Sequence, residues 1–210
     1  MVLSKGEERR QRRGERRREE ILAAAAQVFA AKGYHNATTR EVAEAADLAE
    51  GTIFNYFPSK RDLLIAVFEQ GAKQMRQIAL TQLDPALPMR QALVSLLEST
   101  LAFCCERRLF IRAILAEAWT DPELLRTYAL PRLQRLGSNL QRYLDGQIAA
   151  GRLRPFDTTL GVRVVLGMIA ALVLPIVRGV QPVPSSEEQH HLAENAVDLL
   201  LNGAGVPGEV

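Results

Sequence analysis

The sequence predicts an all-α protein. Apolar residues recur at helical spacing along most of the chain, and no segment shows a β-strand alternation long enough to indicate a sheet. Prolines and glycines divide these stretches into about nine segments. With 210 residues and an apolar fraction of 48%, the chain can enclose one sizeable core or two smaller ones. We therefore expect three short helices followed by about six longer ones.

The first predicted helix covers residues 17–32. Leu22, Ala25 and Phe29 fall on one face of it, and Gly33 is positioned to end it. These apolar residues predict that the helix packs against the elements that follow.

The segment before this helix is strongly basic. Residues 1–18 carry eight basic and three acidic side chains, although the net charge of the whole chain is only +2. We expect residues 1–16 to form a disordered arm that lies near phosphates if the neighbouring helices bind DNA. A solvated tail without a partner is the alternative.

Residues 38–62 indicate two short helices joined by a tight turn, followed by the start of a third. Thr38 and Glu41 have the spacing of a capping box, and Asp47 tolerates the left-handed backbone of a turn. The second helix is predicted at residues 50–56, with Ile53 facing the core. This arrangement is typical of a helix-turn-helix, which places its second helix in the DNA major groove.

Proline ends this second helix. The residue before Pro58 is driven out of helical geometry, and Ser59 with Asp62 is predicted to cap the next helix. Phe54 and Phe57 are interpreted as core residues that pack the second helix on its neighbours.

The same run has a specific family likeness. LAEGTIFNYFPSKRDLL, residues 48–64, resembles the recognition-helix signature of TetR-family regulators, and AAAAQVFAAKGYHNATTREVA, residues 23–43, is similar to the family's first helix and its entry to the motif. The matching positions of the signature are Gly51, Thr52, Phe54, Tyr56, Phe57, Lys60 and Leu63. Asp47 departs from the family's usual Gly, and Glu50 stands where many members have Lys. The likeness covers about residues 17–66; the rest is similar only in length and helical layout.

Side-chain chemistry assigns roles within the motif. Thr39 and Arg40, at a helix N-terminus, are expected to hold phosphate. Asn55 can pair bidentately with adenine, and the methyl group of Thr52 can meet a thymine methyl. Tyr56 and Lys60 are expected at phosphates, and Gly51 allows close approach. The full predicted DNA-binding set is Thr39, Arg40, Glu50, Gly51, Thr52, Asn55, Tyr56 and Lys60.

Glu50 is the unusual member of this set, since it puts a negative charge close to DNA. Three roles are open to it: it can accept a hydrogen bond from a cytosine amino group, cap its own helix, or restrain Arg40 in the free protein.

Helix signals continue to the end of the chain. The helix from Ser59 is expected to reach about residue 80, and helices follow at about 89–106 and 109–119. A helix from Asp121 to about 150 should kink or restart at Pro131. The last two helices are expected at about 158–178, capped by Asp157, and at about 186–201, capped by Ser185 with Glu188.

In the resembled family this second region encloses an effector pocket. The region is rich in aromatic and apolar residues and has few internal charged residues, so the resemblance implies a small, largely apolar effector. The alternative is that these residues form an ordinary core. The predicted effector-binding residues are Phe68, Met75, Phe103, Phe110, Ile114, Trp119, Tyr128, Met168 and Leu172.

The last two predicted helices are unusually apolar for a chain end. As in the resembled family, they are expected to form a four-helix interface with a second copy, and the alternative is that residues 158–178 form the centre of the monomer core. The predicted interface residues are Val164, Gly167, Ala171, Leu174, Leu192, Ala196, Leu199 and Leu200.

Other classes of protein lack support in the sequence. No spacing of ligands indicates a metal site, Cys104 and Cys105 are adjacent and indicate buried thiols rather than a disulfide, and no cofactor motif is present. The apolar run of 14 residues from Val164 to Val177 is shorter than the ~20 that a membrane span needs. Without a signal peptide, the expected location is the cytoplasm.

Together these observations predict a homodimeric transcriptional regulator. The expected parts are a basic arm (1–16), a helix-turn-helix DNA-binding domain (17–62), a helical effector-binding and dimerisation domain (63–203) and a disordered tail (204–210). The resemblance implies a repressor whose two heads bind a palindromic operator and separate from it when the effector binds. A ligand-binding or adaptor protein that no longer reads DNA is the alternative, and an enzyme lacks a recognisable catalytic constellation.

Overall fold

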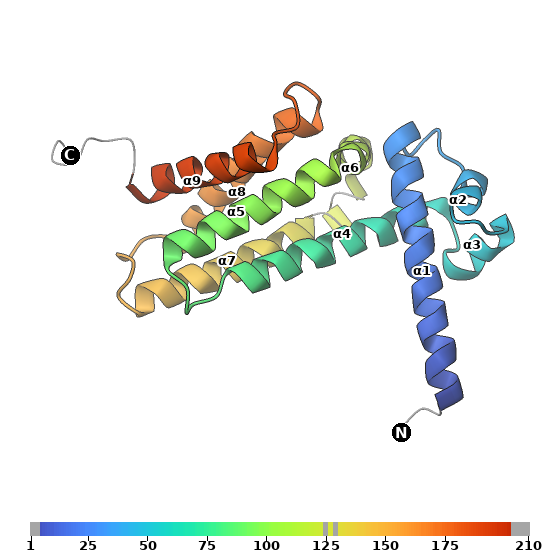
Figure 1. Cartoon of the computed structure of the whole chain (residues 1–210), viewed down its shortest axis with the longest axis horizontal. Helices are drawn as coiled ribbons and strands as arrows, with labels where there is room; N and C mark the ends of the chain where they lie inside the picture. Colours follow the sequence, from blue (N-terminus) through green and yellow to red (C-terminus); the bar gives the residue numbers. More distant parts are fainter. Residues whose placement is uncertain (1–4, 124–125, 128–129, 203–210) are drawn as a thin grey trace. The chain divides into compact units, whose positions relative to one another are not determined.

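The protein is all-helical in its computed structural model, which describes residues 5–123, 126–127 and 130–202 (Figure 1). The described part contains no strand, so the predicted fold class is confirmed. The helices are α1 (Lys5–Lys32), α2 (Thr39–Ala45), α3 (Glu50–Tyr56), α4 (Lys60–Gln82), α5 (Met89–Glu106), α6 (Arg108–Thr120), α7 (Leu130–Ala149), α8 (Thr158–Val177) and α9 (Ser186–Asn202). The predicted tail at 204–210 lies outside the described residues.

The helices divide between two compact units. The first comprises the chain up to Gly71 together with Leu109–Asp121, and the second comprises Ala72–Arg108 together with the chain from Pro122. The predicted boundary between residues 62 and 63 therefore falls inside the first unit, which also includes most of α6. A sequence pattern reports where a helix begins and ends, but it does not report which unit the helix packs into.

The predicted disordered arm is wrong for residues 5–16, which form the beginning of α1. Arg, Gln and Glu dominate this stretch, and these residues are good helix formers. Side-chain pairs one turn apart add support: Gln11 donates to Glu15 at 3.0 Å, and Arg16 pairs with Glu20 at 3.2 Å. The packed half of α1 supplies the helical nucleus that an isolated segment of this length would lack.

The first unit has a small apolar core. Its largest fully buried side chains come from α1, α2, α3 and α4, and they include Ile21, Leu22, Phe29, Val42, Ile53, Leu63 and Leu64. Gly33 ends α1 with a φ of 77°, a left-handed conformation that glycine adopts without strain.

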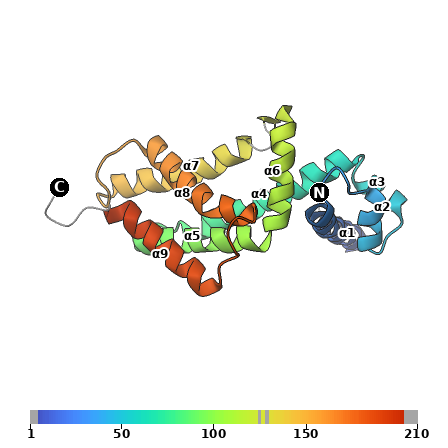
Figure 2. The same cartoon turned by 90° about the horizontal axis from the view of Figure 1, so that it is seen from above.

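The second unit is a bundle in which α5 packs against α8 and α9, and α7 packs against α8 (Figures 1 and 2). A bidentate ion pair joins α5 to α9: Arg90 donates to the two carboxylate oxygens of Asp198 at 2.8 and 2.9 Å. The predicted N-terminal caps are confirmed, since the Asp157 carboxylate accepts from the backbone of α8 and Ser185 with Glu188 forms a capping box before α9. Pro131 lies in the first turn of α7, where its missing N–H costs no hydrogen bond.

The two cysteines are free thiols, and Cys105 is buried whereas Cys104 is half-buried. Burial raises the pKa of the Cys104 thiol to about 11 and also raises that of Cys105. Because the thiolate is the reactive form, both side chains act as small apolar residues at neutral pH, as predicted.

Among the described residues, one helix has the length and composition of a membrane span. It is α8, of 20 residues, and only 28% of its most apolar window is buried. The prediction that this apolar stretch is too short counted residues 164–177 alone, whereas the helix continues through Arg163 to Thr158. The exposed apolar face of α8 therefore needs a partner.

Candidate nucleic-acid interface

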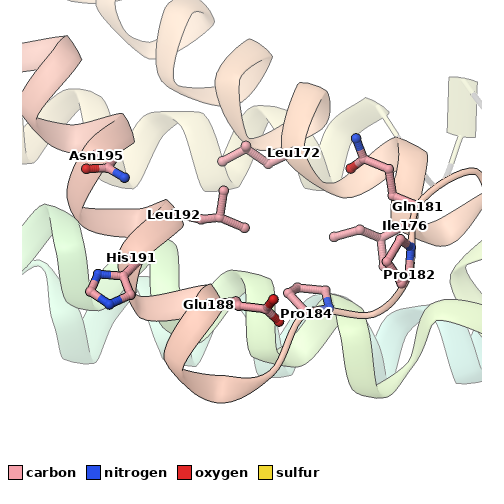
Figure 3. A pocket seen from close by; sticks show the side chains of 9 residues that line it. All are labelled: Leu172, Ile176, Gln181, Pro182, Pro184, Glu188, His191, Leu192 and Asn195. Carbon is pink, nitrogen blue, oxygen red and sulfur yellow. The ribbon is translucent and has the colours of Figure 1, made fainter.

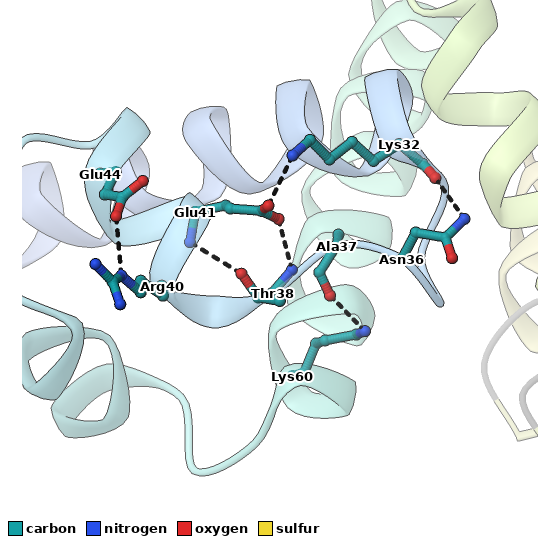
Figure 4. A network of polar contacts seen from close by, with 8 residues as sticks. All are labelled: Lys32, Asn36, Ala37, Thr38, Arg40, Glu41, Glu44 and Lys60. Atoms are coloured by element: carbon teal, nitrogen blue, oxygen red, sulfur yellow. Dashed lines mark hydrogen bonds and ion pairs between the residues drawn. The ribbon is translucent and has the colours of Figure 1, made fainter.

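The helix-turn-helix begins with the predicted capping box (Figure 4). The Thr38 hydroxyl accepts from the Glu41 backbone N–H at 3.2 Å, and the Glu41 carboxylate accepts from the Thr38 N–H at 3.0 Å. The Lys32 ammonium donates to the other carboxylate oxygen at 2.7 Å. These hydrogen bonds, that from Lys32 first, lower the pKa of Glu41. The carboxylate is therefore charged at neutral pH, and its contribution to stability is lost when the pH falls through the lowered pKa.

The turn between α2 and α3 has the predicted geometry. Asp47 adopts a left-handed conformation with a φ of 55°, and the Leu48 N–H donates to the Ala43 carbonyl at 2.9 Å. Asp is one of the few non-glycine residues for which this conformation is common, so its replacement of the family's usual glycine leaves the turn intact.

Lys60 connects the start of α4 to the loop before α2. Its ammonium donates to the Ala37 carbonyl at 2.6 Å (Figure 4). It also donates to the His35 carbonyl at 3.1 Å and lies 4.5 Å from the centre of the Tyr34 ring. From the sequence, Lys60 is expected to contact a DNA phosphate. An ammonium group has three donors, so the two carbonyl bonds leave one for such a contact. The structure thus adds a positioning role, because Lys60 fixes the loop that leads into α2.

We expect Lys60→Met to lower the free energy of unfolding by about 1–2 kcal/mol, because two loop carbonyls lose a charged donor. Lys73→Met is the matched control, since Lys73 is an exposed lysine on the same helix. Chemical denaturation of both variants measures the difference. Equal unfolding free energies for the two variants would contradict the positioning role.

Glu50 joins the two helices of the motif. Its carboxylate accepts a hydrogen bond from the Thr39 hydroxyl at 2.6 Å. Of the three roles left open by the sequence, the structure shows neither a cap on α3, which has no side-chain cap, nor a bond to Arg40, which pairs with Glu44 at 3.0 Å. Glu50 instead ties the first residue of α3 to the first residue of α2, and sequence reasoning missed this contact between residues eleven positions apart.

The exposed face of α3 holds the predicted base-reading residues. Ile53 and Phe57 are buried, one turn apart on the core side. Asn55 and Gly51 are exposed on the other side, and Thr52 and Tyr56 are half-buried between the two faces. The predicted residues of α3 therefore reach solvent on the same helix, and Asn55, the side chain best suited to read adenine, is exposed.

Phe54 corrects the prediction, because it is 47% exposed rather than part of the core. Ile53 marks the buried side of this seven-residue helix, and the next position is turned away from it by about 100°. The helical spacing of Ile53 and Phe57 would have predicted that Phe54 is exposed. An exposed aromatic side chain beside Asn55 belongs to the candidate interface as an apolar contact.

Two polar contacts, one of them an ion pair, connect the α6 region to the rest of the first unit. His35 Nε2 lies 3.2 Å from the Glu117 carboxylate, and Arg61 lies 3.0 Å from the Asp121 carboxylate. Tyr34 is adjacent, and its pKa is raised by burial and then by the charge of Glu117. The sequence does not reveal this contact of His35, because Glu117 lies far along the chain.

The predicted effector residues divide between the units. Phe110 and Ile114 are buried and Phe68 is half-buried in the first unit; Met75, Phe103, Met168 and Leu172 are half-buried in the second. Nothing is described of the Trp119 side chain, and Tyr128 lies outside the described residues.

A groove of about 510 Å³ lies along α8 and α9 (Figure 3). Among the predicted effector residues that the structure describes, Leu172 alone lines it, beside the predicted interface residue Leu192. Ile176, Pro182 and Pro184 make most of its remaining wall apolar, and Glu188, His191 and Asn195 lie along its α9 side.

The predicted interface residues lie at the surface. On α8, Val164 is 49% and Leu174 is 41% exposed, and Gly167 and Ala171 are exposed between them. On α9, Leu199 is 58% exposed, and the three others, Leu192, Ala196 and Leu200, are half-buried. The opposite face of α8 fills the core of the second unit with Val162, Val165, Val173, Ile176 and Val177. Both faces of α8 are thus apolar, and only one of them is covered.

Comparison with known sequences gives two family matches. Residues 21–67 match the profile of bacterial regulatory proteins of the tetR family, and residues 91–203 match the C-terminal domain of AefR-like transcriptional repressors. The first match contains the capping box, α3 and Lys60. The second contains α5 to α9.

Individual proteins show the same likeness. The uncharacterized helix-turn-helix-type transcriptional regulator YhgD of Bacillus subtilis is 27% identical over 145 residues, which are 69% of this chain and 76% of YhgD. The fatty acid metabolism regulator protein of the same bacterium is 41% identical over 44 residues, 21% of this chain and 23% of that protein.

Solved structures extend the likeness to most of the chain. PfmR of Thermus thermophilus, a TetR-family regulator, superposes with a TM-score of 0.71 at 26% identity over 89% of this chain and 99% of its own. FadR of Bacillus subtilis, solved with stearoyl-CoA, superposes with a TM-score of 0.74 at 22% identity, again over 89% and 99% of the two chains.

Proposed function

This chain belongs to the TetR family of transcriptional regulators, and from that premise we propose that it is a homodimeric repressor of a palindromic DNA operator. The observation that carries the proposal is the exposed surface of α3. Ile53, and Phe57 just after the helix, are buried, while Asn55 and Phe54 are exposed. A capping box fixes the start of the neighbouring α2. Members of the family are transcriptional regulators rather than enzymes.

The proposed contacts follow from the geometry of the head. Asn55 reads adenine, while Thr52 and Phe54 offer apolar contacts to thymine methyl groups. Thr39, Arg40 and Tyr56 hold phosphates, and Gly51 permits close approach. Glu50 shapes the site through Thr39, and Lys60 positions the loop before α2.

A second copy is the proposed occupant of the uncovered α8 face. The exposed residues Val164, Gly167, Ala171 and Leu174 repeat at intervals of three and four, so they form one stripe along the helix. Small residues in the stripe allow the partner helix to approach closely. The groove that contains Leu192 continues the same apolar surface onto α9. Dimerisation would cover this surface in the cytoplasm, so α8 need not enter a membrane.

The proposed effector is a small, largely apolar molecule that releases the operator. The nine predicted residues are apolar or aromatic, which suits an apolar group such as an acyl chain, and a fold neighbour, FadR of Bacillus subtilis, was solved with stearoyl-CoA. We assign domain roles accordingly, with residues 17–62 binding DNA and residues 63–203 binding effector and partner.

Selection from a random-sequence duplex library tests the proposal. The protein should enrich a palindrome, and stearoyl-CoA should lower its affinity for that duplex as measured by fluorescence anisotropy. Failure to enrich any sequence, together with retained binding of stearoyl-CoA, would instead identify a ligand-binding protein that no longer reads DNA. Enrichment without an effect of stearoyl-CoA would reject long-chain acyl-CoA as the effector and leave the DNA-binding proposal standing.

A further inference from the structure

The N-terminal half of α1 carries an ordered basic surface. At about 100° per residue, Arg9, Arg12, Arg13 and Arg16 fall within about 100° of one another around the helix axis, and all four side chains are exposed. We call these four residues the arginine face. The described acidic residues of this segment are spread around the helix: Glu7 lies opposite the arginine face, Glu15 and Glu19 lie on its Arg12 side, and Glu20 lies within it, one turn from Arg16.

Folding of the first unit does not use the arginine face. No described side chain from residue 6 to residue 20 is buried, and Ile21 is the first buried residue of α1. Ile21 and Phe29 lie on the side of the helix opposite the arginine face. Arg18 shows the contrast, because its guanidinium stacks 5.2 Å from the centre of the Phe57 ring and thus contributes to packing.

Internal ion pairs neutralise little of this charge. Arg16 pairs with Glu20, but its side chain remains 83% exposed. Within the part of the chain that the structure describes, Arg9, Arg12 and Arg13 have no carboxylate partner. Helix propensity accounts for the helical backbone here, but ion pairing within the described residues does not account for the net positive charge of the arginine face.

We propose that the arginine face binds the phosphate backbone of DNA that flanks the operator half-site. The inference rests on the proposed function, which brings the head of this unit to DNA. α1 continues beyond α2 and α3 (Figure 1), so its first half extends past the elements that read bases. At ~1.5 Å per residue, Arg9 and Arg16 lie about 10 Å apart along the helix.

The chemistry and the charge density of duplex DNA suit this surface. DNA carries one negative charge per about 1.7 Å of its axis, so a 10 Å stretch presents about six phosphates to four arginines. Each guanidinium can donate two parallel hydrogen bonds to one phosphate. Such contacts carry no sequence information, and their strength should fall steeply with salt.

The test replaces Arg9, Arg12 and Arg13 together by glutamine, which keeps helix propensity and removes three charges. Affinity is measured against salt concentration on two duplexes that carry the selected palindrome, one of about 20 bp and one of about 50 bp. On the long duplex, we expect the slope of log K against log salt to become shallower by about 5, because each of the two heads loses three phosphate contacts at ~0.9 per contact. On the short duplex, which lacks flanks, wild type and variant should have similar slopes.

A charge-matched control replaces Arg135, Arg142 and Arg154, three exposed arginines of the second unit, by glutamine. The inference is overturned if the control changes the slope on the long duplex as much as the arginine-face variant does. It is also overturned if the variant and the wild type have the same slope on that duplex while both retain sequence preference. If no palindrome is enriched, the proposed function fails, and the same comparison on random-sequence duplexes of about 50 bp still decides the role of the arginine face.

Discussion

Leu174→Glu is expected to convert the protein to a monomer and to weaken operator binding by about 10²–10⁴-fold. Leu174 is 41% exposed on the uncovered stripe of α8, between apolar neighbours. At a two-fold interface each substitution occurs twice, so two carboxylates would be placed in an apolar interface, at a cost of several kcal/mol. A monomer binds DNA through one head only, so it would lose the gain in affinity of about 10²–10⁴-fold that two linked binding modules provide.

Light scattering gives the mass of the variant, and anisotropy on the selected palindrome gives its affinity. Leu80→Glu is the matched control, since Leu80 is 51% exposed on α4 and lies outside the stripe. The control should remain dimeric and bind as wild type. A dimeric Leu174→Glu protein would show that the α8 stripe is not the interface. Wild-type protein that is monomeric and partitions into lipid vesicles would point to a membrane as the partner of α8.

Asn55→Ala is the second change with a large expected effect. A bidentate contact between Asn and adenine contributes about 1–3 kcal/mol of discrimination, and two heads double it to about 2–6 kcal/mol. The corresponding loss of affinity for the palindrome is about 30-fold to 10⁴-fold. Binding to random duplex should change little, because phosphate contacts remain in place.

Asn202→Ala, at the exposed end of α9, is the control for this substitution. Asn55 is changed alone, because Lys60 holds the loop before α2 and its replacement would disturb the head as well. Undiminished preference of Asn55→Ala for the palindrome would remove Asn55 from the set of base-reading residues. Phe54→Ala then becomes the variant to assay, since Phe54 is the other exposed large side chain of α3.

Local signals in the sequence were sufficient for most of the helices. The bounds of α3 and α5 coincide with their predictions, and Thr38, Asp157 and Ser185 cap helices as expected. Each of these features depends on residues within one or two turns of one another. The interactions that decide them are therefore visible as short-range spacing.

Predictions were weaker where long-range packing decides the outcome. Residues 5–16 looked like a disordered arm, yet they extend a helix whose packed half nucleates them. Phe54 looked like core by composition, but Ile53 marks the buried side of α3. In both cases the conformation or burial of the residue depends on how its whole helix packs, and the local sequence alone does not show that packing.

The sequence by itself therefore determined the helices, their caps, the reading helix and its family, because these depend on neighbours along the chain. Only the tertiary structure decided that Glu50 bonds to Thr39, that Lys60 holds the loop at Ala37, and that His35 pairs with Glu117. It also left one apolar face of α8 uncovered. The physical reason is the same for all of these: a hydrogen bond, an ion pair or a buried face depends on distances in space, and residues far apart in sequence acquire those distances only when the helices pack.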